Sequence, residues 1–167
     1  TKNPVLFKHA QLSDDQLHEA YYEHCVREII RDFYSVITEL SKAELEYYRT
    51  FALDITEQCM PWLVHCELRQ SCISVIVNKF GDQSKKTQCH AINCLVKVTR
   101  SAIRELDEES PKLVLNEILV FLARPTTKPS HRVYCLGFLN KFATLDSPLV
   151  LKQLLGIYFG LFNKLLH

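Results

Sequence analysis

The sequence has few of the residues that interrupt helices. It contains four glycines and six prolines in 167 residues, and the prolines fall between segments whose apolar residues recur with helical spacing. This scarcity predicts long helices with short connections. The β-branched runs lie inside those helical patterns, so no strand is expected. The apolar fraction of 47% excludes a disordered chain and allows a sizeable core.

An excess of charge of one sign is also lacking. The chain has 20 Lys and Arg against 19 Asp and Glu, a formal net charge of +1, so any contact with nucleic acid has to come from a local patch. No apolar run is long enough to span a bilayer, and no N-terminal signal peptide is visible. Because the chain begins without Met and ends inside an apolar pattern, we expect it to be a piece of a longer protein.

The motifs of common catalytic and metal sites are missing as well. There is no Gly-x-Ser-x-Gly, phosphate loop or HExxH, so we expect a non-enzymatic protein without a cofactor or small-molecule substrate. Histidine and cysteine meet at His24-Cys25, His65-Cys66 and Cys89-His90, but no Cys-x-x-Cys occurs. Cys89 and Cys94 diverge around a helix, so no metal site is expected. The seven cysteines indicate a reducing compartment.

The apolar pattern predicts an all-α fold of about seven helices. Residues 1–12 read as an extended lead-in, and residues 13–167 as one helical-repeat domain. The expected helices cover residues 13–40, 41–60, 62–79, 83–106, 110–124, 130–145 and 149–167. The buried stripe predicted for the first helix consists of Leu17, Tyr21, Cys25, Ile29, Phe33, Val36, Ile37 and Leu40.

The ends of these helices carry recognisable signals. Capping boxes at residues 13–16 and 41–44 are expected to open the first two helices. Gly81 is predicted to take a positive φ that ends the third helix, and Asp82 to accept from the free N–H groups of the fourth. Residues 107–109 read as an exposed acidic turn, after which Ser110 and Pro111 supply an N-cap and a first helical position.

Three segments have similar composition and open a second helix in the same way: residues 45–53, 84–95 and 129–139. Each begins with polar or basic residues, continues with a small residue and ends with leucine-type positions. They are separated by roughly 40–45 residues, the period of HEAT and armadillo arrays. We therefore expect an α-solenoid of stacked helix pairs, with an irregular helical bundle as the alternative.

Basic and polar residues recur along one face of the fourth expected helix, opposite its apolar face: Lys86, His90, Asn93, Lys97, Arg100 and Arg104. Lys79 and Lys85 extend this row at the preceding turn. We expect RNA-phosphate contacts at Lys79, Lys85, Lys86, Lys97, Arg100 and Arg104, and the alternative is an ordinary solvated helix face. No aromatic residue is interleaved, so sequence-specific base readout is not expected.

Several segments together resemble a known family. In order they are Val77-Asn78-Lys79-Phe80-Gly81-Asp82, residues 114–124, residues 131–140, and Ile157-Tyr158-Phe159-Gly160-Leu161-Phe162. This succession resembles the CCAAT/enhancer-binding protein zeta family, the nucleolar-complex-associated proteins of the CCAAT-binding-factor group. The resemblance covers residues 70–167 and, more weakly, 31–52. Phe80 stands where the family usually has Leu, and Gln83 where it often has Pro.

The resemblance implies a helical-repeat scaffold of the nucleus and nucleolus that acts in rRNA processing and in assembly of the large ribosomal subunit. Its expected partners are a second nucleolar-complex protein, large-subunit precursor particles and rRNA, with no membrane. The family has no catalytic residues to carry over. The alternative is a general HEAT-type adaptor, nuclear or cytoplasmic, that binds proteins without RNA. The transcriptional role in the family name finds no DNA-reading motif here.

Overall fold

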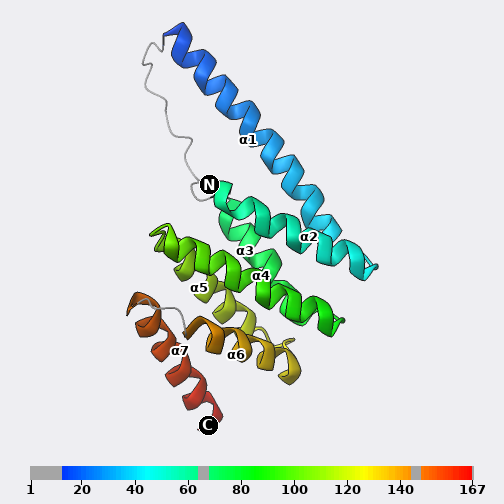
Figure 1. Cartoon of the computed structure of the whole chain (residues 1–167), viewed down its shortest axis with the longest axis vertical. Helices are drawn as coiled ribbons and strands as arrows, with labels where there is room; N and C mark the ends of the chain where they lie inside the picture. The colour runs from blue at the N-terminus through cyan, green and yellow to red at the C-terminus, as the bar shows by residue number, and fades with distance from the viewer. Residues whose placement is uncertain (1–12, 64–67, 144–147, 167) are drawn as a thin grey trace, which may run out of the picture. The chain divides into compact units, whose positions relative to one another are not determined.

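The computed structural model describes residues 13–63, 68–143 and 148–166 (Figure 1). Within these ranges it is all-helical and contains no strand, which confirms the predicted class. No helix in the described part of the chain is sufficiently long and apolar to cross a membrane. The α-helices are α1 (Asp14–Ser41), α2 (Glu46–Cys59), α3 (Leu68–Asn78), α4 (Lys85–Arg104), α5 (Glu109–Ala123), α6 (Pro129–Ala143) and α7 (Pro148–Leu166). Short 3₁₀ segments, Met60–Leu63 and Lys79–Gly81, follow α2 and α3.

The packing divides the chain into two compact units, residues 1–36 and 37–167. The described part of the first unit is the α1 segment up to Val36 together with Ser13. The expected lead-in at residues 1–12 lies outside the described residues. The backbone N–H of Ser13 donates to Oε1 of Gln16 (3.1 Å), and the N–H of Gln16 donates to Oγ of Ser13 (3.3 Å). These reciprocal bonds confirm the first predicted capping box.

The stripe predicted to be buried along α1 is largely exposed. Helical spacing does place its members on one face, but nothing else described in the first unit covers that face. The exposed members are Leu17, Tyr21, Ile29, Phe33 and Val36, with 49–68% of their surface accessible. The prediction was wrong for these residues because an apolar stripe shows which face could be buried and does not supply the covering partner.

The second unit is built of two layers of helices. In one layer α2 packs on α4 and α4 packs on α6, while in the other α3 packs on α5 and α5 packs on α7. Figure 1 shows α2, α4 and α6 following one another through the unit. The segments with similar composition, at residues 45–53, 84–95 and 129–139, form the starts of these same helices. Elements recurring in sequence therefore occupy recurring positions in space.

The core of this unit gathers around α4, which contacts α2, α3, α5 and α6. Ala91, Cys94 and Leu95 are fully buried. The small side chains of Ala91 and Cys94 let neighbouring helices approach closely. Beside α4 lies an aromatic cluster, in which the buried ring of Phe80 lies 6.4 Å from Phe121 and 6.0 Å from Phe138. Phe80 follows α3, Phe121 belongs to α5 and Phe138 belongs to α6. The cluster therefore joins the layer that contains α3 and α5 to the layer that contains α6.

Two of the predicted helix ends at the start of the unit differ from the structure. No glycine among the described residues has a positive φ, so the prediction for Gly81 was wrong: the residue ends a 3₁₀ turn instead. The second predicted capping box is also absent, because Ser41 still belongs to α1 and its hydroxyl donates to the carbonyl of Thr38 (2.7 Å). The cap position of α2 is Leu45, which makes no side-chain cap bond.

Two aspartates, the buried Asp82 and the half-buried Asp107, precede the next two helices of the unit. The N-cap of α4 is Ser84, whose Oγ accepts from the N–H of Thr87 (3.4 Å), and Asp82 accepts from the N–H of Ser84 (3.0 Å). Asp82 thus acts one step before the position that the sequence suggested. Asp107 similarly accepts from the N–H groups that open α5, so that helix starts at Glu109 and not after Ser110.

These aspartates also connect successive helices within each layer. Arg49, in the first turn of α2, binds Asp82 through two bonds of 2.9 and 3.1 Å. Arg69, in the first turn of α3, binds Asp107 (3.0 Å). Each bond joins the start of one helix to the turn before the next helix of the same layer. The side chain of Asp107 is only 10% exposed, so the prediction of an exposed acidic turn was wrong for this residue.

Candidate functional site on the exposed face of α4

The predicted basic row follows the solvent-facing side of α4. Lys85, Lys86, Lys97, Arg100 and Arg104 are exposed. His90 is half-buried, and Asn93 is exposed and accepts a hydrogen bond from the ammonium of Lys141 in α6 (3.1 Å). The face is narrow because α4 is covered on its other sides, so these positions are where a ligand can reach the central helix of the unit.

Acidic residues of α2 face half of this row. The ammonium of Lys86 lies 3.7 Å from Glu46, the Nε2 of His90 lies 2.7 Å from Oδ1 of Asp54, and the ammonium of Lys97 lies 2.9 Å from Glu57. The hydrogen bond with Glu57, followed by the charge of that carboxylate, raises the pKa of Lys97. These three basic residues therefore link α2 to α4 as well as facing solvent.

Lys79 lies apart from the exposed row. Its side chain is 14% exposed, and its ammonium lies 3.5 Å from the carboxylate of Asp82, which Arg49 also binds. Burial lowers the pKa of Lys79 against the opposing effect of Asp82, and the nearby charge of Arg49 lowers it further. Of the predicted RNA contacts this is the one that the structure turns inward, so it adds no accessible charge.

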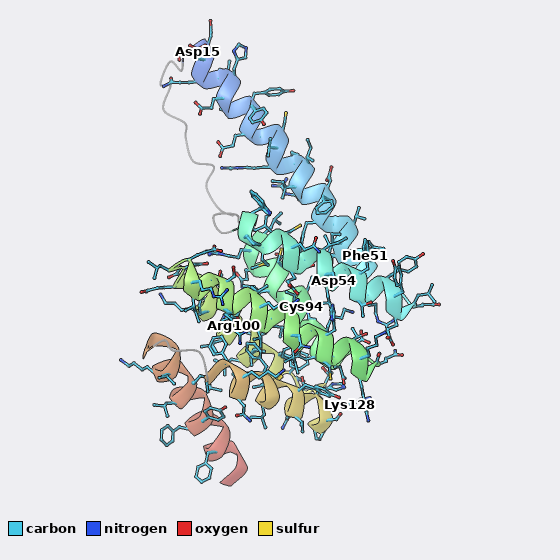
Figure 2. The ribbon with its side chains drawn as sticks, viewed as in Figure 1. Asp15, Phe51, Asp54, Cys94, Arg100 and Lys128 are labelled. Atoms are coloured by element: carbon cyan, nitrogen blue, oxygen red, sulfur yellow. The ribbon has the colours of Figure 1, made fainter. Side chains whose placement is uncertain are left out.

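The remaining cations of the row are available to a ligand. Among the residues that the structure describes, Lys85, Arg100 and Arg104 have no ion-pair partner. Arg100 and Arg104 are one helical turn apart and therefore project from the same side of α4. Figure 2 labels Arg100 on this helix, away from the point where Asp54 and Cys94 face each other.

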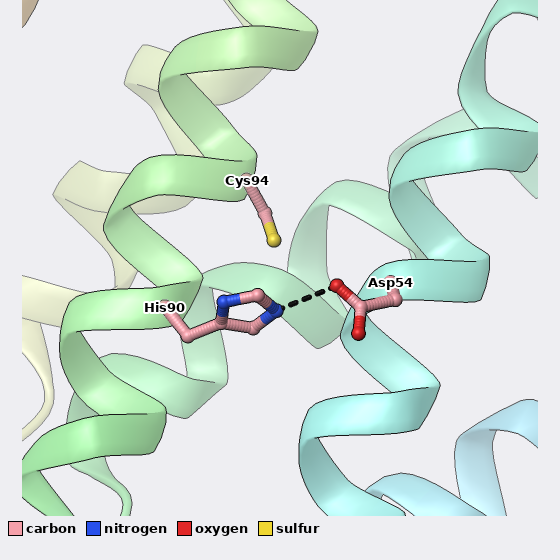
Figure 3. Close-up of side chains that lie close together, drawn as sticks. All are labelled: Asp54, His90 and Cys94. Carbon is pink, nitrogen blue, oxygen red and sulfur yellow. Dashed lines mark hydrogen bonds and ion pairs between the residues drawn. The ribbon is translucent and has the colours of Figure 1, made fainter.

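Three chemically different side chains meet between α2 and α4 (Figure 3). A carboxylate oxygen of Asp54, a ring nitrogen of His90 and the sulfur of Cys94 all lie within 4.8 Å of one another. His90 and Cys94 are four residues apart and share one face of α4, while Asp54 reaches them from α2. Cys94 is fully buried, whereas Asp54 and His90 are partly exposed.

The environment of Cys94 keeps its thiol protonated. Burial raises the pKa of this thiol strongly, and the hydrogen bond to Glu57 and the charges of Glu57 and Asp54 raise it further. A buried, protonated thiol is a poor nucleophile. The Nε2 of His90 is already engaged by Asp54. The arrangement therefore lacks the accessible, activated thiolate of a cysteine nucleophile, but it contains the donor types that a transition metal ion prefers.

Sequence reasoning did not bring these three residues together. It considered histidines and cysteines that are close in sequence, and Asp54 comes from a helix 36 residues before His90. Of the other pairs considered, His24 is exposed on α1 and Cys89 is exposed on α4, and residues 65–66 lie outside the described residues. The detectable signals were His90-x-x-x-Cys94 on one helix and Asp54-x-x-Glu57 on another, each with its pair on one helical face.

A second candidate surface lies between α5, α6 and α7. It is a groove of about 760 Å³ whose floor and walls are mainly aliphatic. Lys112, Arg124 and Arg132 add positive charge along it; Arg124 donates to Asn78 (2.6 Å) and lies over the ring of Phe121. The aliphatic residues lining the groove include Leu115, Leu119, Leu122, Leu136 and Ile157.

Comparison with known proteins identifies no relative of this chain. A scan against known protein families, a search of curated proteins and a search of solved structures each found no match.

Proposed function

We propose that this chain is a segment of a non-enzymatic HEAT-like scaffold that acts in nucleolar assembly of large-subunit precursors and in rRNA processing. The observation that carries the proposal is the two-layer order of α2 to α7. From α2 to α5, each helix packs on the second helix after it, as stacked helix pairs do in an α-solenoid. The arginine–aspartate bonds that join successive helices of both layers support the same reading.

This architecture suits a protein that works by being bound. Stacked pairs expose long surfaces on which partners can lie. The groove between α5 and α7 offers an apolar surface with cations beside it for a protein partner, such as a second nucleolar-complex protein. The exposed cations at the C-terminal end of α4 offer contacts to the phosphates of rRNA. The resemblance to the CCAAT/enhancer-binding protein zeta family supplies the pathway and the nucleolar location.

Affinity purification of the full-length protein tests the pathway. We expect it to bring down proteins and RNA of large-subunit precursors. A control purification uses a variant with Leu119→Asp and Leu136→Asp, which places two carboxylates in the groove. The variant should lose the protein partner while keeping its helical circular-dichroism spectrum. Purified material that contains no large-subunit precursor component would contradict the proposal.

The RNA contact is tested by charge reversal at Arg100 and Arg104, since neither has an ion-pair partner in the described part of the chain whose loss would complicate the result. A matched control reverses Lys128, just before α6, and Lys152 in α7, two exposed lysines outside α4, with the same change in net charge. Binding of a structured rRNA fragment is measured against salt concentration. We expect the Arg100→Glu/Arg104→Glu variant to reduce the slope of log K against log salt by about 2, near one per lost contact. Equal weakening by both variants would instead indicate a nonspecific effect of net charge.

A general helical-repeat adaptor, nuclear or cytoplasmic, is the second candidate function. It is favoured by the acidic face of α2, which pairs with Lys86 and Lys97 and so reduces the charge available to RNA. This reading predicts that reversing Arg100 and Arg104 leaves rRNA binding unchanged. It also predicts that the groove variant still loses its protein partner, and that this partner is unrelated to ribosome assembly.

A further inference from the structure

The meeting point of α2 and α4 contains one carboxylate, one imidazole and one thiol directed into the same space (Figure 3). We propose that Asp54, His90 and Cys94 bind a divalent transition metal ion of the zinc class. Ligands of this mixture are typical of such ions, because sulfur and imidazole nitrogen suit zinc and its neighbours, whereas magnesium and calcium take oxygen.

The distances fit an ion with little rearrangement. Bonds of about 2.0–2.3 Å to zinc place two ligand atoms of a tetrahedral site about 3.3–3.8 Å apart. The oxygen of Asp54 and the Nε2 of His90 are 2.7 Å apart, and all three ligand atoms lie within 4.8 Å of one another. Rotation of partly exposed side chains is sufficient to adjust the first distance, with the ion replacing the proton that Asp54 and His90 share.

Water completes the coordination, as in zinc sites with three protein ligands, and Glu57 lies next to the group of three without belonging to it. Glu57 lies one helical turn after Asp54, so both carboxylates project from the same side of α2. Its carboxylate accepts a hydrogen bond from the ammonium of Lys97 (2.9 Å) and adds negative charge near the thiol of Cys94. This negative charge favours a divalent ion at the group of three over an empty site.

The local charges also balance. A thiolate and two carboxylates contribute three negative charges, which the divalent ion and the ammonium of Lys97 together neutralise. Solvent reaches the site past Asp54 and His90, whose side chains are 48% and 32% exposed, while Cys94 anchors the ion from the buried side. The bound ion would clamp α2 to α4 and so stabilise the first contact of this layer.

Cobalt titration of the untagged 167-residue protein tests the site, because Co²⁺ replaces zinc and its thiolate complexes absorb strongly in the near ultraviolet. We expect one equivalent of Co²⁺ to bind, with a thiolate charge-transfer band that Zn²⁺ abolishes by displacement and Mg²⁺ leaves unchanged. Cys94→Ser should remove the band. Cys89→Ser is the matched control, because this exposed cysteine lies on the same helix and its loss should leave the titration unchanged.

A second variant guards against a folding artefact. Asp54→Asn removes one charged ligand at a half-exposed position while leaving an amide to contact His90, so the helices should remain packed. We expect it to weaken Co²⁺ binding at least tenfold and to abolish the rise in melting temperature that Zn²⁺ gives the unsubstituted chain. The proposal is overturned if no band forms, if the band survives Cys94→Ser, if Cys89→Ser removes it, or if Asp54→Asn binds Co²⁺ as tightly as the unsubstituted chain.

Discussion

The carboxylate of Asp82 makes three kinds of contact in the second unit. It accepts from the backbone N–H of Ser84 before α4, binds the guanidinium of Arg49 through both oxygens, and lies beside the ammonium of Lys79. Burial alone would raise the pKa of Asp82. The bond from Ser84, the bonds and charge of Arg49, and the charge of Lys79 outweigh that effect and hold the pKa below its usual range.

The Asp82→Asn substitution should strongly destabilise the second unit. It removes the only carboxylate among the described residues that pairs with Arg49 or Lys79, and an unpaired buried cation is costly. We expect the free energy of unfolding at pH 7 to fall by about 3–5 kcal/mol, measured by urea titration. Glu44→Gln, at an exposed position of the same unit, should change it by less than about 0.5 kcal/mol.

The same carboxylate predicts a pH dependence. Because the pKa of Asp82 is lower in the folded than in the unfolded chain, its contribution to stability is fully present above the unfolded pKa, about 3.9. It is lost as the pH falls through the lower, folded value. The difference in unfolding free energy between the unsubstituted chain and Asp82→Asn should therefore shrink as the pH falls below about 4. A difference that stays constant down to pH 2 would show that the carboxylate is not the cause.

At the scale of the element, the end of α4 shows how a helix can stop without glycine. The N–H of Leu106 donates to the carbonyl of Ile103 (3.2 Å), and the N–H of Asp107 donates to the carbonyl of Ala102 (2.9 Å). This is the hydrogen-bond pattern of a Schellman motif, with Leu106 in the left-handed position at φ 59°. A leucine in that conformation is strained by about 1–2 kcal/mol.

Leu106→Gly should consequently stabilise the protein, because glycine is the residue preferred at this left-handed position after a helix. The side chain of Leu106 is 88% exposed, so its removal costs little packing, and glycine relieves the left-handed strain. Glycine also increases the conformational entropy of the unfolded chain, which offsets part of this effect. We expect the free energy of unfolding to rise by about 0.5–1 kcal/mol, measured by thermal and urea unfolding. Leu106→Ala separates the causes, since it removes the same side chain but keeps the Cβ and should bring no gain.

The helices themselves could be predicted from the sequence, and their ends could be predicted only in part. Apolar periodicity reports which residues share a face, so every α-helix of the described part was expected in its place. Capping depends on which groups the fold brings near. The sequence predicted Asp82 as a capping residue and Asp107 as part of an exposed turn, and only packing reveals that Arg49 and Arg69 approach them from preceding helices.

The candidate site shows the same limit. The spacing along α4 identified a solvent-facing row of cations, because that row depends on one helix alone. Which of these cations are neutralised depends on α2, whose Glu46, Asp54 and Glu57 belong to a different segment. The cluster of Asp54, His90 and Cys94 likewise exists only through the contact of two helices.

At the largest scale, a stacked array and a single bundle predict different responses of the second unit to damage at one end. In a stacked array each pair depends mainly on its neighbours, so damage at one end need not reach the other. In a bundle with a single cooperative core, a destabilised helix lowers the stability of every helix equally. Buried residues at opposite ends of the α2–α4–α6 layer can distinguish these cases, because Leu53 of α2 and Phe142 of α6 are both fully buried.

We predict that Phe142→Ala lowers hydrogen-exchange protection in α6 and α7 and leaves α2 close to its original protection. Removing the buried ring should cost about 3–5 kcal/mol locally, and nearest-neighbour coupling should reduce that loss through α4 before it reaches α2. Leu53→Ala is the mirror experiment and should lower protection in α2 while sparing α6. Each variant acts as the control for the other, since both remove a fully buried side chain and differ in which end they weaken. If either substitution lowers protection by the same amount in every helix from α2 to α7, the unit unfolds as one body. The repeat spacing in the sequence would then describe a bundle and not a solenoid.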